Sequence, residues 1–551
     1  REHETICVTT ACNGWVAGHG KIWGADPREI AESDLIVVWG GNPVSTQVNV
    51  MTHIAKARKT RGAKLIVIDP YRTPTAEAAD IHIPIRPGTD GALACAVMQV
   101  LFAENLADWG YMREFSDGPE HLQQHLTTRT PEWAEGITGI PADDIRDLAR
   151  LYGRTERAYL RCGYGFTRSR NGAANMHAVT CLPVVTGKWK HKGGGALFSN
   201  RELYGVDGTL IKGLDVVDPA TRALDMSQIG RVLTGDARAL KGGPPVTVLF
   251  TQNINPAEVA PETGRVIDGM MRDDLFTCVH EQFMTASAKL ADIVLPATMF
   301  LEHEDMYQGG GHFYLQGHKA LIEPPGECRS NVDVINGLAR RLGSDYPAFH
   351  MTAWELIDDA LRRSGRPSAD QVLAEGWIDC TKPFEDAHFL NGFGHADGKF
   401  HFAADWSKIG ADCDAMSALP DHLDVIDEAT EAHPYRLVAA PARRFLNTSF
   451  TETPSSRKKE GRPMALIHPD TCKALGLDEG DRVRLGNDLG DLVVHVRPFD
   501  GLQVHTVVVE GIWPNAAFEE GRGINTIISA DAALPGGGAA FHDTAIWMRP
   551  A

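Results

Sequence analysis

The most informative absences in this 551-residue sequence concern charge, cysteine spacing and hydrophobic runs. Acidic residues outnumber basic ones by 72 to 54, so the chain lacks the basic excess expected of a nucleic-acid or anionic-membrane binder. Its ten cysteines include no Cys-x-x-Cys pair, which argues against a zinc ribbon or a thioredoxin-like motif. No apolar run approaches the roughly 20 residues of a membrane-spanning helix. We therefore expect a soluble, cytoplasmic protein, or a periplasmic one if a leader was removed.

Two catalytic signatures are also missing. Gly163 and Gly165 lack the third glycine of a nicotinamide fingerprint, and nothing resembles the nucleophile elbow of a hydrolase. The segment 302–305 reads EHED and is a candidate metal cluster. However, adjacent side chains diverge and no second ligand group follows at a metal-like spacing, so a solvated or structural turn is the alternative interpretation.

What the sequence does contain is a repeated strand and turn. Residues 35–43 read LIVVWGGNP and residues 246–256 read VTVLFTQNINP, with their Asn-Pro pairs 213 positions apart (255 minus 42). Residues 76–84, AEAADIHIP, recur as AKLADIVLP at 288–296, 212 positions apart (296 minus 84). A short apolar strand that ends in such a turn delivers its carboxyl end to a ligand. The repeat predicts an α/β fold with two related doubly wound units.

The remaining patterns predict further elements in each unit. In the first unit they indicate strands at 64–68, 81–85 and 157–162, and helices at 48–60, 91–105 and 171–186. In the second unit they indicate a strand end at 278–282 and a helix at 283–292. Short alternating strands at 482–485, 491–497 and 504–509 predict a small C-terminal β-barrel.

These elements suggest four domains. We expect a first α/β dinucleotide-binding unit with a metal-ligand loop at residues 1–199, and a second α/β dinucleotide-binding unit with an incomplete sheet at residues 200–343. A mixed connecting region would span 344–430 and the barrel 431–551. A chain of this length exceeds one hydrophobic core and should divide in this way.

Several residues could contact a ligand at the strand ends. Asp69 ends a predicted strand, where it could accept hydrogen bonds from a ribose or a guanine edge, or could equally cap the next turn. Thr89 or Asp90 would be a helix N-cap, whose free amides could bind a phosphate or pterin, although a plain N-cap needs no ligand. Local positive charge at Arg161 or Arg168, among nearby arginines, could serve an anionic cofactor.

Cys7 has two interpretations. By composition alone it is a buried core cysteine. However, small and polar residues follow it, and it precedes the first predicted ligand-binding strand. It could therefore project a thiolate into a cleft between the two units, where soft ligands suit redox metals.

The order of these motifs resembles that of the molybdopterin oxidoreductases, the dimethyl-sulfoxide-reductase superfamily that includes formate dehydrogenases and nitrate reductases. The resemblance covers nearly the whole chain and rests on ordered segments: TICVTTACNG at 5–14, WGGNP at 39–43, IDP at 68–70, RPGTD at 86–90, GYG at 163–165, ADIVLP at 291–296 and the terminal barrel. It implies one molybdenum or tungsten held by two molybdopterin guanine dinucleotides. It also implies two-electron redox chemistry on a small-molecule substrate, with an electron-transfer partner.

The resemblance also assigns roles to individual residues. Cys7 corresponds to the protein ligand of the metal, and is the implied catalytic residue. The implied cofactor-binding residues are Gly41, Asn42, Pro43, Asp69, Gly88, Thr89, Asp90, Gly163 and Gly165 in the first unit, Asn253, Asn255 and Gln282 in the second, and Asn447, Thr448, Ser449 and Asn525 in the barrel.

Two departures from the family pattern shape the expectation. Formate dehydrogenases place a histidine directly after the metal ligand, whereas this chain has Val8, so formate oxidation is disfavoured. The cysteine set of the family's [4Fe-4S] cluster is absent, so we expect an amino-terminal cysteine-rich segment in the intact product and an incomplete sheet in the second unit. Alternatives are a non-redox hydratase or transhydroxylase, or a metal-free scaffold subunit of an electron-transfer complex.

Overall fold

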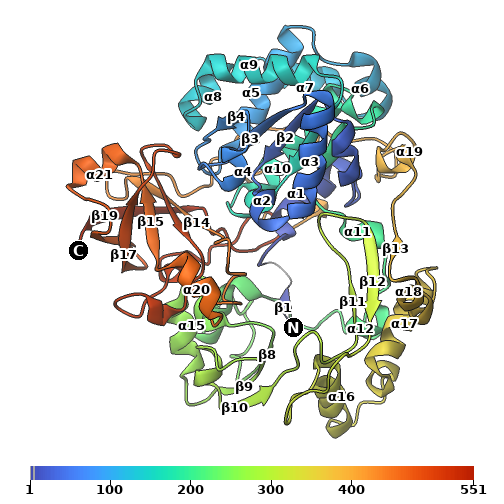
Figure 1. Ribbon diagram of the computed structural model, residues 1–551, viewed down its shortest axis with the longest axis vertical. Coiled ribbons are helices and arrows are strands. Elements are labelled where there is room, and N and C mark those ends of the chain that lie inside the picture. The colour runs from blue at the N-terminus through green and yellow to red at the C-terminus, as the bar shows by residue number, and fades with distance from the viewer. Residues whose placement is uncertain (1, 4–5) are drawn as a thin grey trace.

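The computed structural model describes residues 2–3 and 6–551. An α/β unit occupies the top of the molecule in Figure 1, a smaller α/β unit lies below it, a β-barrel lies to one side and a helical segment to the other. The predicted fold class, two α/β units with a C-terminal barrel, is confirmed. Within the described residues, no helix combines the length and apolar character needed to cross a bilayer.

A five-stranded parallel sheet forms the centre of the first unit. Its order is β4-β3-β2-β5-β6, from β2 (Leu35–Trp39), β3 (Lys64–Ile68), β4 (Ile81–Ile83), β5 (Ala158–Cys162) and β6 (Gly195–Leu197). All of β2 is buried, because helices cover both faces of the sheet. Parallel strands place their carboxyl ends at one edge, so the turns after β2, β3 and β5 meet there.

Helices pack on this sheet where the apolar pattern predicts them. α3 (Val48–Arg61) ends at Gly62, whose φ of 68° is left-handed. α1 (Thr9–His19) packs so closely on α10 (Gly172–Val185) that a Cβ on Gly14 would lie 2.2 Å from the Ala173 carbonyl oxygen. The other helices before the second unit are α2 (Pro43–Thr46), α4 (Pro74–Glu77), α5 (Asp90–Ala103), α6 (Trp109–Phe115), α7 (Pro119–Leu126), α8 (Pro131–Thr138), α9 (Ala142–Arg154), α11 (Arg201–Tyr204) and α12 (Thr209–Lys212).

The second unit has a smaller and more exposed sheet. Its three parallel strands, in the order β10-β9-β8, are β8 (Val248–Gln252), β9 (Phe276–Glu281) and β10 (Ile293–Pro296), and helices α13 (Ile229–Leu233), α14 (Pro256–Val259) and α15 (Thr263–Met270) accompany them. This order repeats β4-β3-β2, without a counterpart of β5 and β6 among the described residues. Val248, Phe276 and Ile293 are 64%, 47% and 45% exposed. The sheet is therefore incomplete relative to the first.

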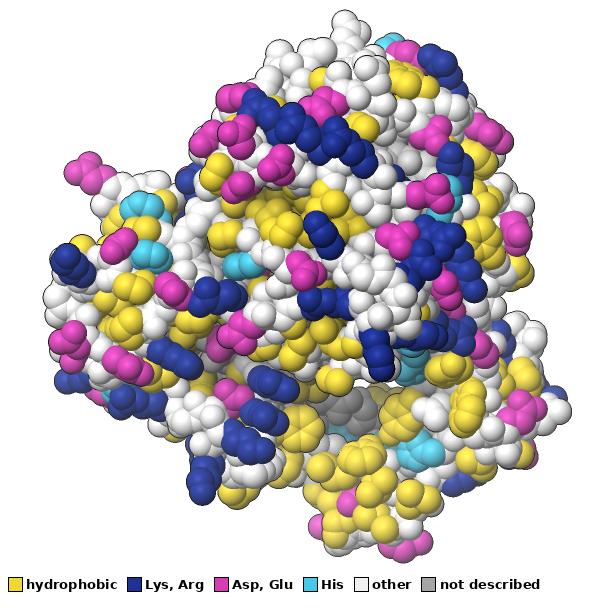
Figure 2. Space-filling view, turned by 45° about the horizontal axis from the view of Figure 1, so that its top comes forward, with side chains coloured by type: hydrophobic (Ala, Val, Ile, Leu, Met, Phe, Trp, Pro, Cys, Tyr) yellow, Lys and Arg dark blue, Asp and Glu magenta, His cyan; other side chains and the backbone are white. Residues whose placement is uncertain are grey.

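Hydrophobic side chains also gather on the molecular surface in this region. Figure 2 shows them at the lower end of the molecule, the end that Figure 1 assigns to the second unit and helix α16 (Asn331–Arg341). Phe300 and Leu321, which lie between β10 and α16, are among the exposed apolar side chains.

The helix predicted at 283–292 is wrong. The segment contains only one 3₁₀ turn, Ala288–Leu290. The Thr285 hydroxyl accepts a hydrogen bond from the Ala288 amide at 3.2 Å, and the Ser287 hydroxyl donates to Asn255 Oδ1 at 2.7 Å. These local side-chain bonds compete with the helical ladder and tie the segment to the preceding strand end.

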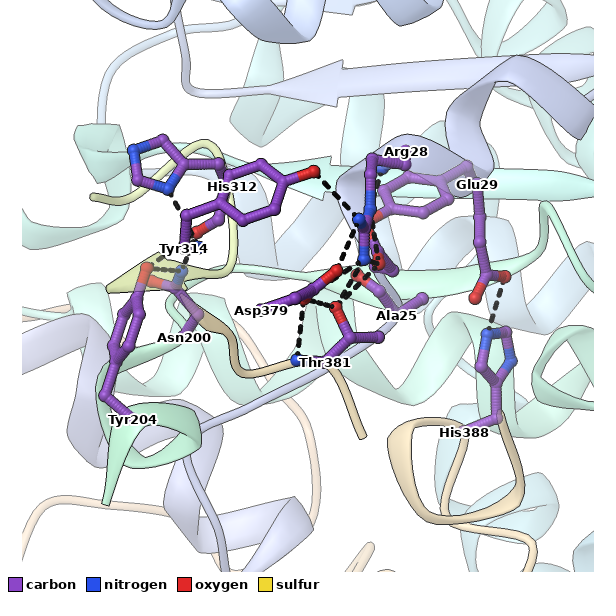
Figure 3. A network of polar contacts seen from close by, with 12 residues as sticks. Ala25, Arg28, Glu29, Asn200, Tyr204, His312, Tyr314, Asp379, Thr381 and His388 are labelled. Atoms are coloured by element: carbon purple, nitrogen blue, oxygen red, sulfur yellow. Dashed lines mark hydrogen bonds and ion pairs between the residues drawn. The ribbon is translucent and has the colours of Figure 1, made fainter. Parts of the chain in front are cut away.

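A small antiparallel sheet connects the first unit to the lower helices. It consists of β11 (Asp305–Tyr307), β12 (Tyr314–His318) and β13 (Ile378–Asp379), and is followed in space by α17 (Ala353–Arg363) and α18 (Ala369–Glu375). Arg28 of the first unit donates to Asp379 Oδ2 at 2.8 Å and to Tyr314 Oη at 3.0 Å (Figure 3). This cation holds the sheet against the first unit.

The C-terminal barrel closes from six strands. They are β14 (Tyr435–Ala440), β15 (Met464–Ile467), β16 (Arg482–Asn487), β17 (Gly490–Pro498), β18 (Thr506–Glu510) and β19 (Thr544–Pro550), in the order β14-β18-β15-β17-β16-β19. The three predicted barrel strands correspond to β16, β17 and β18. Alternate residues such as Val483 and Leu485 point into the buried core of the barrel.

Candidate active site

A cleft lies between the carboxyl edge of the first sheet and the barrel. The turns after β2, β3 and β5 form one wall, residues 438–442 and His542 form another, and the cleft holds about 1390 Å³ of space, part of it open to solvent. The predicted site residues that line it are Gly41, Asn42, Pro43, Asp69, Gly88, Asp90, Gly163 and Gly165. The fold thus brings residues from four separate turns to one place.

Two glycine turns meet at this edge of the sheet. The Gly163 amide donates to the Trp39 carbonyl at 2.7 Å, and the Gly165 amide donates to the Gly40 carbonyl at 2.8 Å. A Cβ on Gly163 would lie 2.1 Å from Gly40 O and 2.4 Å from Gly41 Cα. Any side chain at position 163 would therefore push the two strand ends apart. The first role of these glycines is to let two turns approach each other.

The Asn42 side chain stabilises the first of these turns through two hydrogen bonds. Its Oδ1 accepts a hydrogen bond from the Thr75 hydroxyl at 2.7 Å, and its Nδ2 donates to Ser45 Oγ at 3.2 Å. Asn255 repeats the arrangement in the second unit, where its Oδ1 accepts from the Ser287 hydroxyl at 2.7 Å. Both asparagine side chains are thus occupied within their own units.

Asp69 is a buried carboxylate with little support from the protein. It is 8% exposed, and it accepts one long hydrogen bond, from the Tyr71 amide at 3.4 Å. Burial raises the pKa of Asp69 to about 8. Two donors from a ligand, such as the N1–H and amino groups of a guanine, would supply the hydrogen bonds that the described residues do not.

Asp90 is a second buried carboxyl at the cleft, and it lies in a turn with Gly88 and Thr89. Burial raises the pKa of Asp90 to about 6, although Trp39 Nε1 donates to its carboxylate at 2.7 Å. Gly88 has a φ of 78°, and Thr89 Oγ1 donates to the Arg86 carbonyl at 2.7 Å. Thr89 is buried and does not line the cleft.

The expected free amides at the start of α5 are partly occupied. The Gly91 amide donates to Asn175 Oδ1 at 3.0 Å, and Asn171 Nδ2 donates to the Gly88 carbonyl at 2.8 Å. Sequence reasoning missed both asparagines. The available signal was two asparagines four positions apart, one at the N-cap and one in the first turn of the apolar helix α10, because buried amides require partners.

Cys7 is exposed, so the interpretation of a buried core cysteine is wrong. It lies just before Val8, the N-cap residue of α1. Cys7 does not belong to the cleft wall defined above. Helix α1, which begins two residues after Cys7, contacts the 3₁₀ turn Tyr164–Thr167 at the β5 end of the cleft.

The second-unit residues do not line this cleft. Asn255 is buried, Asn253 is exposed with a φ of 59°, and Gln282 Nε2 donates to the Thr298 carbonyl at 2.9 Å. In the segment 302–305, His303 Nδ1 pairs with the Thr298 hydroxyl at 2.8 Å and Glu304 pairs with Lys319 at 2.8 Å. These contacts fit the structural-turn interpretation of that segment.

The barrel residues divide into two places. Asn447, Thr448 and Ser449 form a tight turn in which the Leu446 and Ser449 backbones exchange hydrogen bonds. Asn525 is buried, and its Nδ2 donates to the Glu258 carbonyl at 2.8 Å while its Oδ1 has no partner.

Glu258 joins the barrel to the second unit. Its carboxylate accepts from Asn255 Nδ2 at 2.6 Å and from the Asn515 amide at 3.1 Å. Burial raises the pKa of this carboxyl. Glu258 was not predicted from the sequence, because an acid just after Asn255-Pro256 is also an ordinary first-turn residue.

Further polar residues line the cleft, among them Arg161, Tyr164, Arg168 and His542. The sequence indicates Arg161 and Arg168 only as local positive charge, and sequence reasoning missed Tyr164 and His542. Burial lowers the pKa of His542 to about 3, and its Nε2 has no hydrogen-bond partner. Arg170, in contrast, pairs with Asp543 at 3.0 Å.

Comparisons with known families extend over most of the chain. The model of the molybdopterin oxidoreductase family matches residues 7–341. The model of the molybdopterin dinucleotide binding domain matches residues 435–545. The first match contains both α/β units, and the second contains almost all of the barrel.

Individual relatives give the same picture. The chain is 34% identical to the "Probable oxidoreductase YoaE" of Bacillus subtilis, over 98% of this chain and 78% of that protein. It is 27% identical to the "Dimethyl sulfoxide/trimethylamine N-oxide reductase" of Rhodobacter capsulatus, over 91% and 69%. Among solved structures it resembles the acetylene hydratase from Pelobacter acetylenicus, with a TM-score of 0.78 at 20% identity, over 98% and 81%. That last likeness concerns the fold alone.

Proposed function

The chain belongs to the molybdopterin oxidoreductase family, and from this premise we propose which of its residues hold the cofactor and bind substrate. The cofactor is a molybdenum or tungsten ion carried by two molybdopterin guanine dinucleotides. When bound, it supplies two-electron chemistry, as transfer of an oxygen atom or of a hydride equivalent. The residues of the chain bind it, orient it and exclude water around it.

The observation that carries the proposal is the poorly partnered Asp69 in the cleft. Its buried carboxylate would accept the donors of one guanine. Arg168, whose guanidinium lies 5.6 Å from the centre of the Phe541 ring, would face the phosphates. The turns at Gly41–Pro43, Gly88–Asp90 and Gly163–Gly165 would present backbone to the dinucleotide and pterin.

A second dinucleotide would occupy the second unit. Asn253, Asn255 and Gln282 lie at the matching strand ends, and Asn525 is joined to Asn255 through Glu258. The unpartnered buried Oδ1 of Asn525 supports a ligand there. The turn at Asn447, Thr448 and Ser449 would cover this dinucleotide from the barrel.

Cys7 would be the protein ligand of the metal. Its exposure leaves the sulfur free to coordinate, and thiolates suit such metals. A separate electron-transfer protein would exchange the two electrons with the centre. It would supply them if the chain reduces its substrate, and would accept them if the chain oxidises its substrate.

Two measurements test the assignment. Denatured holoenzyme should release about two guanine nucleotides per metal, and release of none would contradict the cofactor proposal. Cys7→Ser should change the metal's absorption spectrum while the melting temperature stays close to that of the unmodified protein. Cys12→Ser, at a buried cysteine, is the control and should leave the spectrum unchanged.

A non-redox hydration is the second candidate. It rests on the name of one fold neighbour, acetylene hydratase, whose likeness to this chain concerns the fold alone. Holoenzyme that turns over substrate without oxidising or reducing a viologen dye would support hydration. Stoichiometric dye oxidation or reduction would support the redox assignment.

A further inference from the structure

Arg161 is a buried cation with neutral partners. It is 4% exposed, its Nη1 donates to the carbonyls of Leu197 and Phe198 at 3.0 Å each, and its Nη2 donates to Gln47 Oε1 at 2.6 Å. Nε has no partner. No ion pair within 4.0 Å joins Arg161 to any acid in the part of the chain that the structure describes. A buried charge without a counter-charge costs free energy unless a ligand supplies one.

Arg436 shows the usual alternative within the same molecule. It is equally buried, at 2% exposure, but its guanidinium lies 3.2 Å from the Asp543 carboxylate. The fold therefore provides a carboxylate counter-charge for the buried Arg436 of the barrel. Among the described residues it provides none for Arg161 at the cleft. Because Arg161 lines the cleft, an anion that enters the cleft can provide it.

Tyr164 stands beside Arg161 at the same end of the cleft. Its side chain is 37% exposed and lines the cleft, so the phenol can donate a hydrogen bond to a ligand. Burial raises the pKa of Tyr164, and the charge of Arg161 opposes this rise.

The tip of the β11–β12 hairpin forms a wall over these side chains. A Cβ on Gly310 would lie 3.1 Å from Gln47 Nε2 and 3.7 Å from Tyr164 Oη. Asn200 Nδ2 donates to the carbonyls of Gly309 and His312 at 2.7 Å each, as Figure 3 shows for its labelled residues. Asn200 thus holds the hairpin tip where it borders Gln47 and Tyr164.

We propose that Arg161, Tyr164 and the hairpin tip at 309–311 form the substrate subsite, and that this subsite takes a small anion bearing oxygen. Arg161 supplies the counter-charge, Tyr164 donates a hydrogen bond to an oxygen, and Gly310 limits the size. The inference rests on the proposed function, because it places the substrate in the cleft that the proposed cofactor would occupy. It adds a substrate class that excludes large or neutral acceptors.

Calorimetric titration of the purified holoenzyme tests the subsite. The anionic probes are nitrate and selenate, and dimethyl sulfoxide is the neutral probe. We expect Arg161→Gln to weaken binding of the preferred anion at least tenfold, and Arg161→Lys to recover part of the loss. Tyr164→Phe should weaken it three- to tenfold, and Gly310→Ala should weaken selenate more than nitrate. Arg154→Gln, which removes an exposed charge outside the cleft, is the matched control and should leave binding unchanged.

Measuring the guanine nucleotide and metal contents of the purified protein separates the cofactor proposal from the subsite proposal. If the purified protein contains neither guanine nucleotide nor metal, the proposed function fails, whether or not the anions bind. If Arg161→Gln alone loses guanine nucleotide, Arg161 serves a cofactor phosphate and the subsite proposal is overturned while the family cofactor stands. The proposal is also overturned if neither anion binds, or if Arg161→Gln binds them as tightly as the unmodified protein does.

Discussion

The two α/β units share a local design and differ in what surrounds it. Leu35 and Val248 occupy matching positions (248 minus 35 is 213), yet Leu35 is 1% exposed and Val248 is 64% exposed. The asparagine turns are nevertheless alike, since Asn42 bonds Thr75 as Asn255 bonds Ser287. The turn is therefore stabilised by its own hydrogen bonds, whereas the burial of the strand depends on neighbours that only the first unit supplies.

The close contact of two strand ends is the feature of the first unit that a substitution would disturb most. Gly163→Ala should destabilise the protein by at least about 3 kcal/mol, because the added Cβ would overlap the Gly40 carbonyl. Gly264→Ala, in α15 of the second unit, has nothing within 4 Å and should change stability by less than about 1 kcal/mol. Urea unfolding measures both, and equal midpoints for the two variants would contradict the difference between the units.

Matched strand positions test the difference in burial directly. Leu35→Ala should cost about 3 kcal/mol, as a core truncation does. Val248→Ala should cost less than about 0.5 kcal/mol, because its side chain is already in water. A comparable cost at Val248 would mean that another surface covers the second sheet in solution.

For the matched asparagines Asn42 and Asn255, the substitution in the second unit should destabilise the protein more than the substitution in the first unit. Asn255→Ala should cost about 2 kcal/mol, because it leaves buried groups of Ser287 and Glu258 without partners. Asn42 is only half-buried, so Asn42→Ala should cost about 1 kcal/mol. Thermal unfolding of the cofactor-free protein ranks them, and a larger loss at Asn42 would reverse the assignment of the tighter turn.

The smallest expected effect is a difference in pH dependence. Asp69 matches Gln282 in the repeat (282 minus 69 is 213), and only Asp69 titrates. Its folded pKa of about 8 lies above the ordinary 3.8, so its contribution is fully present below about pH 4 and is lost as pH rises towards 8.

Asp69→Asn should therefore match the unmodified cofactor-free protein near pH 4 and exceed its stability increasingly as the pH rises towards 8. Gln282→Asn should show no such trend. Urea unfolding across this pH range provides the measurement. A stability difference for Asp69→Asn that does not change with pH would show that the carboxylate is well solvated in the open cleft.

The sequence by itself determined the elements whose pattern is local. The apolar runs at β2 and β3, the repeat offset and the alternating strands of the barrel all appear where they were predicted. These patterns are legible because a buried strand or a helix stop depends mainly on the nearest few residues. The residues implied by the family resemblance in the first unit likewise follow strand ends, and a parallel sheet brings such ends together.

Only the tertiary structure decided where the polar groups find partners. The segment 283–292 has a helical composition, but the Ser287 hydroxyl bonds to Asn255, 32 positions earlier, and the helix does not form. Arg161 lies in a strand that could have met an acid, yet its side chain donates to backbone carbonyls and a side-chain amide from two other segments. The physical reason is that the free energy of a buried polar group depends on whichever distant atoms surround it, and a local pattern does not carry that information.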